Sequence, residues 1–275
     1  VEKDTMSNEE YLTSVYVPYD SVKQSKSTCV VEQAPRASEK GTVLLEATVT
    51  NDGTNTGFGV YLPYNFDAER EQPYPLLAIY HGGGGFCGSW LNNGLANILD
   101  NMIAEGRMEP TVVVTPDATD LNYSGARVAE YLENTLLPYI SDTYNASTDP
   151  QRRALAGLSA GGNCTMYVYF NNTELFDTYI AMSPPMHADT TNPNFEKPEL
   201  MDVNLFIGFG LYDHVATRAF YNEAVGARES SAYDYVWGLG QAGVPFKIKN
   251  DLHYGHQWNL WRELAVYTFD NFLWK

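Results

Sequence analysis

A serine between glycines, in the run Gly157-Leu158-Ser159-Ala160-Gly161, is the part of this sequence best suited to covalent chemistry. A short apolar run over residues 153–156 precedes it, and a helix-like stretch begins at Gly162. A strand, this pentapeptide and then a helix form the context of a nucleophile elbow, in which small neighbours let strand and helix pass close to the serine. The alternative is a tight turn with a helix-capping serine. We predict that Ser159 is a nucleophile.

A serine nucleophile needs an imidazole to take its proton and a carboxylate to orient that imidazole. Behind an elbow of this kind the acid and then the histidine follow the serine along the chain. Asp213 comes after the apolar run 204–209 and a glycine, at the strand end where sites form in open sheets. Its alternative role is the N-cap of a helix over residues 217–225. Asp251 is a rival acid, but it lies in the same loop as the favoured histidine.

Two of the five histidines, His253 and His256, lie between the last predicted strand and the last predicted helix. We favour His256 as the base, because Gly255 permits a tight turn before it and Trp258 can anchor the helix after it. His81 opens a glycine run and is expected to be structural.

That glycine run, residues 82–85, is suited to holding a developing oxyanion, since its backbone N–H groups can approach a substrate closely. The other N–H group should come from Ala160, the residue after the nucleophile. A phosphate-binding loop is excluded because no Lys-Ser or Lys-Thr pair follows the glycines. No metal site is expected, since the sequence contains none of the common zinc or calcium motifs.

Strands and helices that alternate along the chain must position these residues. Eight strands are predicted, the first two in a hairpin and the other six separated by crossover-length segments: 42–50, 57–63, 76–80, 111–115, 154–156, 178–183, 203–209 and 245–249. Helices are predicted over 91–105, over 126–144 with a kink at Pro138, and over 259–272. Continuous apolar strands joined by crossovers predict an α/β protein with a mostly parallel sheet covered on both faces. We expect one domain over residues 1–275, with residues 1–40 as an N-terminal arm of open role.

The composition narrows the choice of partners. There are 17 basic and 34 acidic residues, a formal net charge of −17, so nucleic acid and anionic membrane surfaces are poor partners. No apolar run approaches the roughly 18 residues of a membrane span. Because the chain begins at Val1, we expect a secreted protein whose signal peptide is absent here. Three cysteines, Cys29, Cys87 and Cys164, allow at most one disulfide.

Several spaced motifs together resemble the family 1 carbohydrate esterases, and above all the feruloyl esterase domains of microbes that degrade plant cell walls. The motifs are the glycine loop 81–85, the segments 97–106 and 111–116, the elbow 156–162, and the segment 255–261. The resemblance covers roughly residues 42–275 and leaves 1–40 unmatched. It implies an α/β-hydrolase fold and a cofactor-free Ser-His-Asp mechanism.

For the site, the resemblance implies a triad of Ser159, His256 and Asp213, with oxyanion donors at Gly83 and Ala160. The loop is richer in glycine than is usual for the family, so the donor could instead be Gly82 or Gly84.

The resulting hypothesis is a serine esterase that removes feruloyl or p-coumaroyl groups from arabinoxylan. An apolar slot for the aromatic acyl group is expected along Pro185, Met186 and Trp258. The alternatives are an acetylxylan esterase with the same triad, a non-catalytic carbohydrate-binding relative, and a serine peptidase on this fold.

Overall fold

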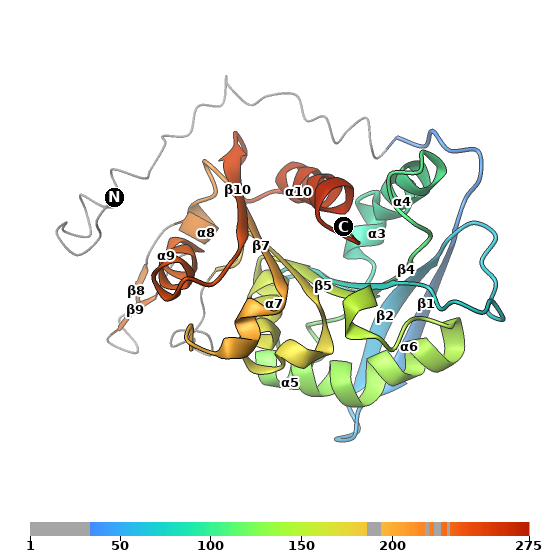
Figure 1. Ribbon diagram of the computed structural model, residues 1–275, viewed down its shortest axis with the longest axis horizontal. Coiled ribbons are helices and arrows are strands. Elements are labelled where there is room, and N and C mark those ends of the chain that lie inside the picture. Colours follow the sequence, from blue (N-terminus) through green and yellow to red (C-terminus); the bar gives the residue numbers. More distant parts are fainter. Residues whose placement is uncertain (1–33, 186–193, 218–219, 223–226, 230–231, 275) are drawn as a thin grey trace.

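An eight-stranded sheet forms the centre of the computed structural model, which describes residues 34–185, 194–217, 220–222, 227–229 and 232–274 (Figure 1). The strands lie in the order β1-β2-β4-β3-β5-β6-β7-β10. Their bounds are β1 Thr42–Val49, β2 Asn55–Leu62, β3 Leu76–Tyr80, β4 Val112–Pro116, β5 Arg153–Leu158, β6 Thr178–Met182, β7 Asn204–Gly210 and β10 Lys247–Leu252.

The sheet is mostly parallel, as the sequence predicts. β2 runs antiparallel to both β1 and β4, and every other neighbouring pair in this sheet is parallel. All five residues of β3 are buried, as are all six of β5, which is typical of strands covered on both faces. The carboxyl ends of β3, β5, β7 and β10 therefore meet along one edge of the sheet, where their loops can form a site.

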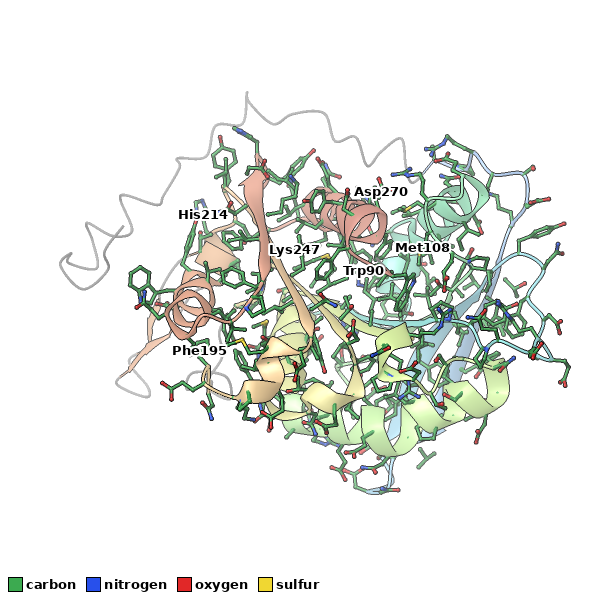
Figure 2. The ribbon with its side chains drawn as sticks, viewed as in Figure 1. Trp90, Met108, Phe195, His214, Lys247 and Asp270 are labelled. Carbon is green, nitrogen blue, oxygen red and sulfur yellow. The ribbon has the colours of Figure 1, made fainter. Side chains whose placement is uncertain are left out.

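Helices cover both faces of this sheet (Figure 1). Two hydrophobic cores lie between the helices and the sheet. One core contains Leu155 and residues of the helices α5 Gly125–Tyr131, α6 Leu137–Tyr144 and α7 Ala160–Asn171. The other core contains Ala154 and Ala156 and residues of the helices α3 Ser89–Asn92, α4 Leu95–Ala104 and α10 Trp258–Asn271. Neighbouring residues of β5 thus point to opposite cores, as strand geometry requires. Figure 2 shows Trp90 on the α10 side of the molecule and Phe195 on the opposite side.

Two predicted helices are each divided in the structure. The segment 91–105 forms α3 Ser89–Asn92 and α4 Leu95–Ala104, separated at Gly94, whose φ of 91° breaks the helical path. The segment 126–144 forms α5 Gly125–Tyr131, a π-helical turn η3 Leu132–Leu136, and α6 Leu137–Tyr144. The π turn is how the chain accommodates Pro138, which has no N–H to donate and whose ring would clash with the preceding turn.

The remaining elements are helices, short helical turns and one separate pair of strands. They are η4 Pro150–Arg152, α7 Ala160–Asn171, η5 Thr173–Leu175, η7 Pro198–Met201, α8 His214–Thr217, β8 Phe220–Asn222, β9 Ala227–Glu229, α9 Ala232–Ala242 and α10 Trp258–Asn271. The antiparallel pair β8–β9 was not predicted. No helix in the described part of the chain is long and apolar enough to cross a membrane.

The described end of the N-terminal arm is tied to α4. Asn101 accepts hydrogen bonds from the backbone N–H groups of Arg36 and Ala37 and donates to the carbonyl of Ala34. Asp100 accepts from the N–H of Gly41. Residues 34–41 therefore lie along the α4 side of the sheet.

Candidate active site

Ser159 occupies a strained turn between β5 and α7. Its backbone has φ 52° and ψ −121°, a conformation that L-residues rarely adopt. Two hydrogen bonds hold it there, from its N–H to the carbonyl of Met182 at 2.8 Å and from the N–H of Asn163 to its own carbonyl at 3.0 Å. Because strain of this kind persists only where the surroundings enforce it, the turn is a candidate functional element. The serine side chain makes no capping hydrogen bond to α7, which excludes the capping alternative.

The glycines of the elbow are required by close contacts between backbones. A Cβ on Gly157 would lie 2.3 Å from the carbonyl oxygen of Gly161, and a Cβ on Gly161 would lie 2.3 Å from the carbonyl oxygen of His81. Contacts this short with backbone atoms cannot be relieved by rotating a side chain. The two glycines therefore let β5, α7 and the end of β3 approach one another around Ser159.

A Gly161→Ala variant is expected to lose about 1–3 kcal/mol of unfolding free energy and most of its activity, because the added methyl group must push the elbow away from His81. The matched control is Gly240→Ala, since a Cβ at this exposed position in α9 meets nothing within 4 Å. That control should be neutral or more stable by about 0.5–1 kcal/mol, the difference in helix propensity. Urea denaturation measures both, and equal stability of the two variants would contradict this packing argument.

Three side chains from separate loops form a hydrogen-bonded chain at the sheet edge. His256 Nε2 lies 2.8 Å from Ser159 Oγ, and His256 Nδ1 lies 2.9 Å from Asp213 Oδ1. Asp213 follows β7 and has no exposed surface, while His256 lies between β10 and α10. Since a carboxylate only accepts, Nδ1 carries the proton that faces Asp213, and Nε2 is left to accept the serine proton. The arrangement can therefore deprotonate Ser159 and stabilise the imidazolium that results.

Asp251 and His253, the alternatives to Asp213 and His256, take no part in these hydrogen bonds to Ser159 and His256. Asp251 is exposed and pairs with Lys249 at 2.9 Å, and the hydrogen bond from Lys249 lowers the pKa of the Asp251 carboxyl. His253 has Nδ1 3.4 Å from the hydroxyl of Tyr212.

Asp213 has a second role, because its Oδ1 also accepts from the N–H of Ala216 at 3.1 Å. Asp213 therefore also caps a helix, which was its alternative role. The capped helix is the short α8 His214–Thr217 rather than one over 217–225.

Trp261 supports the imidazole and was not singled out by the sequence. Its ring packs edge-to-face with that of His256, with centroids 4.9 Å apart. Its Nε1–H donates to Ser183 Oγ at 3.0 Å, and Trp258 packs against it at 5.3 Å. The spacing of Trp258 and Trp261, three residues apart at the start of a predicted helix, was the available signal that both rings share one face.

The glycine loop faces Ser159. A Cβ on Gly82 would lie 2.9 Å from Ser159 Cβ, whereas Gly83 and Gly84 are exposed and a Cβ on either meets nothing within 4 Å. Neither the N–H of Gly83 nor that of Ala160 has an acceptor among the described residues. Ala160 begins α7, where the first N–H groups of a helix lack intrahelical partners. The site can therefore present backbone donors to an anion.

A cavity of about 190 Å³ opens beside Ser159. It is lined by His81, Gly82, Gly83, Gly84, Gly85, Ser89, Leu158, Ser159, His256, Trp258 and Trp261. Trp258, one of the three residues predicted to form an apolar slot, thus lines the cavity. Pro185 is not one of the lining residues, and Met186 lies outside the described residues.

No group of three or more His, Cys, Asp or Glu side chains that could hold a metal ion occurs in the described segments. Cys87 and Cys164 form no disulfide with each other, and Cys29 lies outside the described residues.

Comparisons with known proteins give the family of the chain. Residues 50–264 match the esterase family. Endo-1,4-beta-xylanase Y of Acetivibrio thermocellus and an endo-1,4-beta-xylanase/feruloyl esterase of Xylanibacter ruminicola are each 31% identical over a match 163 residues long. Each match covers 55% of this chain. The chain spans only 14% and 22% of the lengths of these two relatives.

Solved structures show the same fold. A family 1 ferulic acid esterase from Anaeromyces mucronatus, in complex with ferulic acid, superposes with a TM-score of 0.72 at 16% identity. The match covers 94% of this chain and 97% of that one. The predicted α/β-hydrolase fold is thus confirmed. The family match covers most of the chain, and the chain therefore belongs to the esterase family.

Proposed function

We propose that this protein hydrolyses hydroxycinnamoyl esters, in particular feruloyl esters on plant cell-wall arabinoxylan. The observation that carries the proposal is the hydrogen-bonded chain from Asp213 through His256 to Ser159, which ends in a cavity with two tryptophans in its wall. An aromatic acyl group is the ligand that such a wall suits, since aromatic rings pack favourably edge-to-face or offset. The relative from Xylanibacter ruminicola carries xylanase and feruloyl esterase in its name, which supports the same substrate class.

The reaction follows from the positions of the groups. Ser159 Oγ attacks the ester carbonyl carbon while His256 Nε2 takes the hydroxyl proton, and the carbonyl oxygen becomes an oxyanion. The N–H groups of Gly83 and Ala160 stabilise this oxyanion. The C–O bond to the sugar then breaks, and His256 returns the proton to the departing sugar alcohol.

The same groups hydrolyse the acyl-enzyme. Water gives a proton to His256 and attacks the Ser159 ester, and hydroxycinnamic acid leaves as Ser159 regains its proton. Asp213 stabilises the imidazolium in both halves. We propose that the protein acts outside the cell, where arabinoxylan is found. Its net charge of −17 is compatible with an uncharged polysaccharide backbone.

The test is initial-rate hydrolysis of methyl ferulate, acetylated xylan and 4-nitrophenyl acetate by the purified protein. Strong turnover of methyl ferulate, with little acetate released from xylan, is the expected result. Release of acetate from xylan without turnover of methyl ferulate would make the protein an acetylxylan esterase with the same catalytic groups. Turnover of none of the three esters would contradict the proposal as a whole.

A further inference from the structure

Three donors lie within hydrogen-bond distance of the carbonyl oxygen of Gly82. A carbonyl oxygen has two lone pairs, so this oxygen has one donor more than it has lone pairs. His81 Nδ1 lies 2.8 Å from this oxygen, the Tyr123 hydroxyl donates to it at 3.1 Å, and the N–H of Gly85 donates at 3.1 Å. Because a carbonyl only accepts, His81 Nδ1 carries a proton. The orientation of the peptide that joins Gly82 to Gly83 is therefore set from one side.

That orientation decides where the next N–H group points. In a trans peptide the carbonyl and the following N–H point in opposite directions, and none of the described peptide bonds is cis. With the Gly82 oxygen turned toward His81 and Tyr123, the N–H of Gly83 points away from them. Gly83 is exposed and lines the cavity beside Ser159. This orientation favours Gly83 over Gly82 and Gly84 as the donor from the loop.

The loop that follows β4 supplies the supporting side chains and is itself strained. Asn122 and Tyr123 are consecutive non-glycine residues with φ of 54° and 51°. The Tyr123 hydroxyl also lies 3.0 Å from Thr119 Oγ1, which donates to the carbonyl of Gly85 at 3.2 Å. The loop thus reaches both ends of the glycine turn. Strain in two neighbouring residues is typical of segments that a function requires.

His81 is fixed by the same loop. Its ring is buried, and its Nε2 lies 3.1 Å from Asp117 Oδ1. Asp117 also accepts from the N–H groups of Cys87 and Thr119. Burial raises the pKa of Asp117, but the hydrogen bonds from His81 and these two N–H groups bring it down to about 2. Asp117 is therefore an anion at neutral pH.

We propose that Tyr123 and His81 are positioning residues that aim the N–H of Gly83 at the oxyanion, an inference that rests on the proposed function. They touch no reacting atom. Their contribution is to hold one peptide plane, so their loss should weaken binding of the tetrahedral state and leave binding of the planar ester unchanged. Nothing in the motif of the glycine loop itself identifies Tyr123, which lies 41 residues further along the chain.

The experiment compares Tyr123→Phe with the wild type on methyl ferulate. The expected result is a fall in kcat of about 10-fold to 100-fold with KM within about 2-fold, since loss of an oxyanion donor itself costs roughly 10²–10³. Affinity for an aryl boronic acid, which forms a tetrahedral adduct with the serine, should fall by the same factor as kcat. Affinity for ferulic acid should not change. Tyr139→Phe is the matched control, because its hydroxyl donates to Glu46 at the surface.

Equal loss of boronic acid and ferulic acid affinity would overturn the inference, since general loosening of the site would weaken both. Wild-type kcat in Tyr123→Phe would overturn it too. If Tyr123→Phe does not fold, Thr119→Val removes the neighbouring hydroxyl and is expected to show the same selective loss in weaker form; unchanged boronic acid affinity there would count against the inference. Failure of the proposed function is distinguishable, because it would appear as a wild type inactive on every ester.

Discussion

Alanine in place of Ser159 or His256 is expected to lower kcat on methyl ferulate by about 10⁵–10⁶, and the double variant should be no worse than either single one. The reason is that the two side chains act as one unit, joined by the 2.8 Å contact between Ser159 Oγ and His256 Nε2. Without the base the hydroxyl is a poor nucleophile, and without the hydroxyl the base has nothing to activate. Steady-state kinetics on the three variants, after melting curves show that each is folded, measure this effect.

His253→Ala is the matched control for this prediction. His253 lies in the same loop, but it is exposed and its ring contacts Tyr212 rather than Ser159. We expect it to retain wild-type kcat within a few-fold. Additive losses in the double variant, or an inactive His253→Ala, would contradict the assignment of Ser159 and His256 as partners.

Asparagine in place of Asp213 is expected to lower kcat by about 10⁴ while stability changes little. A neutral amide cannot stabilise the imidazolium that forms on His256 as the anionic carboxylate does. Stability should survive because asparagine is as good an N-cap as aspartate, so the bond from the N–H of Ala216 is kept. Asp213→Ala removes the cap as well, and it should therefore cost both activity and about 1 kcal/mol of unfolding free energy.

Asp251→Asn serves as the control, because Asp251 is the other acid near His256 in the sequence and pairs only with Lys249 among the described residues. It should leave kcat unchanged. If Asp213→Asn kept near-wild-type kcat while Asp251→Asn lost it, the carboxylate that orients His256 would have been assigned wrongly. If Asp213→Asn lost stability and activity together, its effect would be structural.

Much of the fold could be predicted because the strands carry local signals. The runs 112–114 and 76–80 are continuous apolar segments with prolines or glycines close to their ends, and all eight strands of the main sheet were predicted within two or three residues. The breaks inside two of the predicted helices were harder to predict. Helical periodicity continues through Gly94 and Pro138, and whether a helix bends, divides or adds a π turn there depends on what it packs against.

Some residues of the candidate site could be predicted from the sequence and others could not. Ser159, Asp213 and His256 could be selected from their order along the chain and their places after strands, which are local properties, and the structure brings the three together. Their catalytic roles remain predictions. Tyr123 and Trp261 could not be selected, since their contacts with Gly82 and Ser183 join residues 41 and 78 positions apart. A glycine in the sequence indicates that a positive φ is possible, but a tyrosine does not, so the left-handed backbone at Tyr123 could not be predicted.

The most direct test of the central claim is to trap the acyl-enzyme. The wild-type protein is mixed with excess 4-nitrophenyl ferulate, quenched in acid within milliseconds to seconds, digested and analysed by peptide mass spectrometry. We expect one feruloyl group on the peptide that contains Ser159, and none in Ser159→Ala. A feruloyl group on a different residue, or turnover of the ester by Ser159→Ala at the wild-type rate, would contradict the central claim.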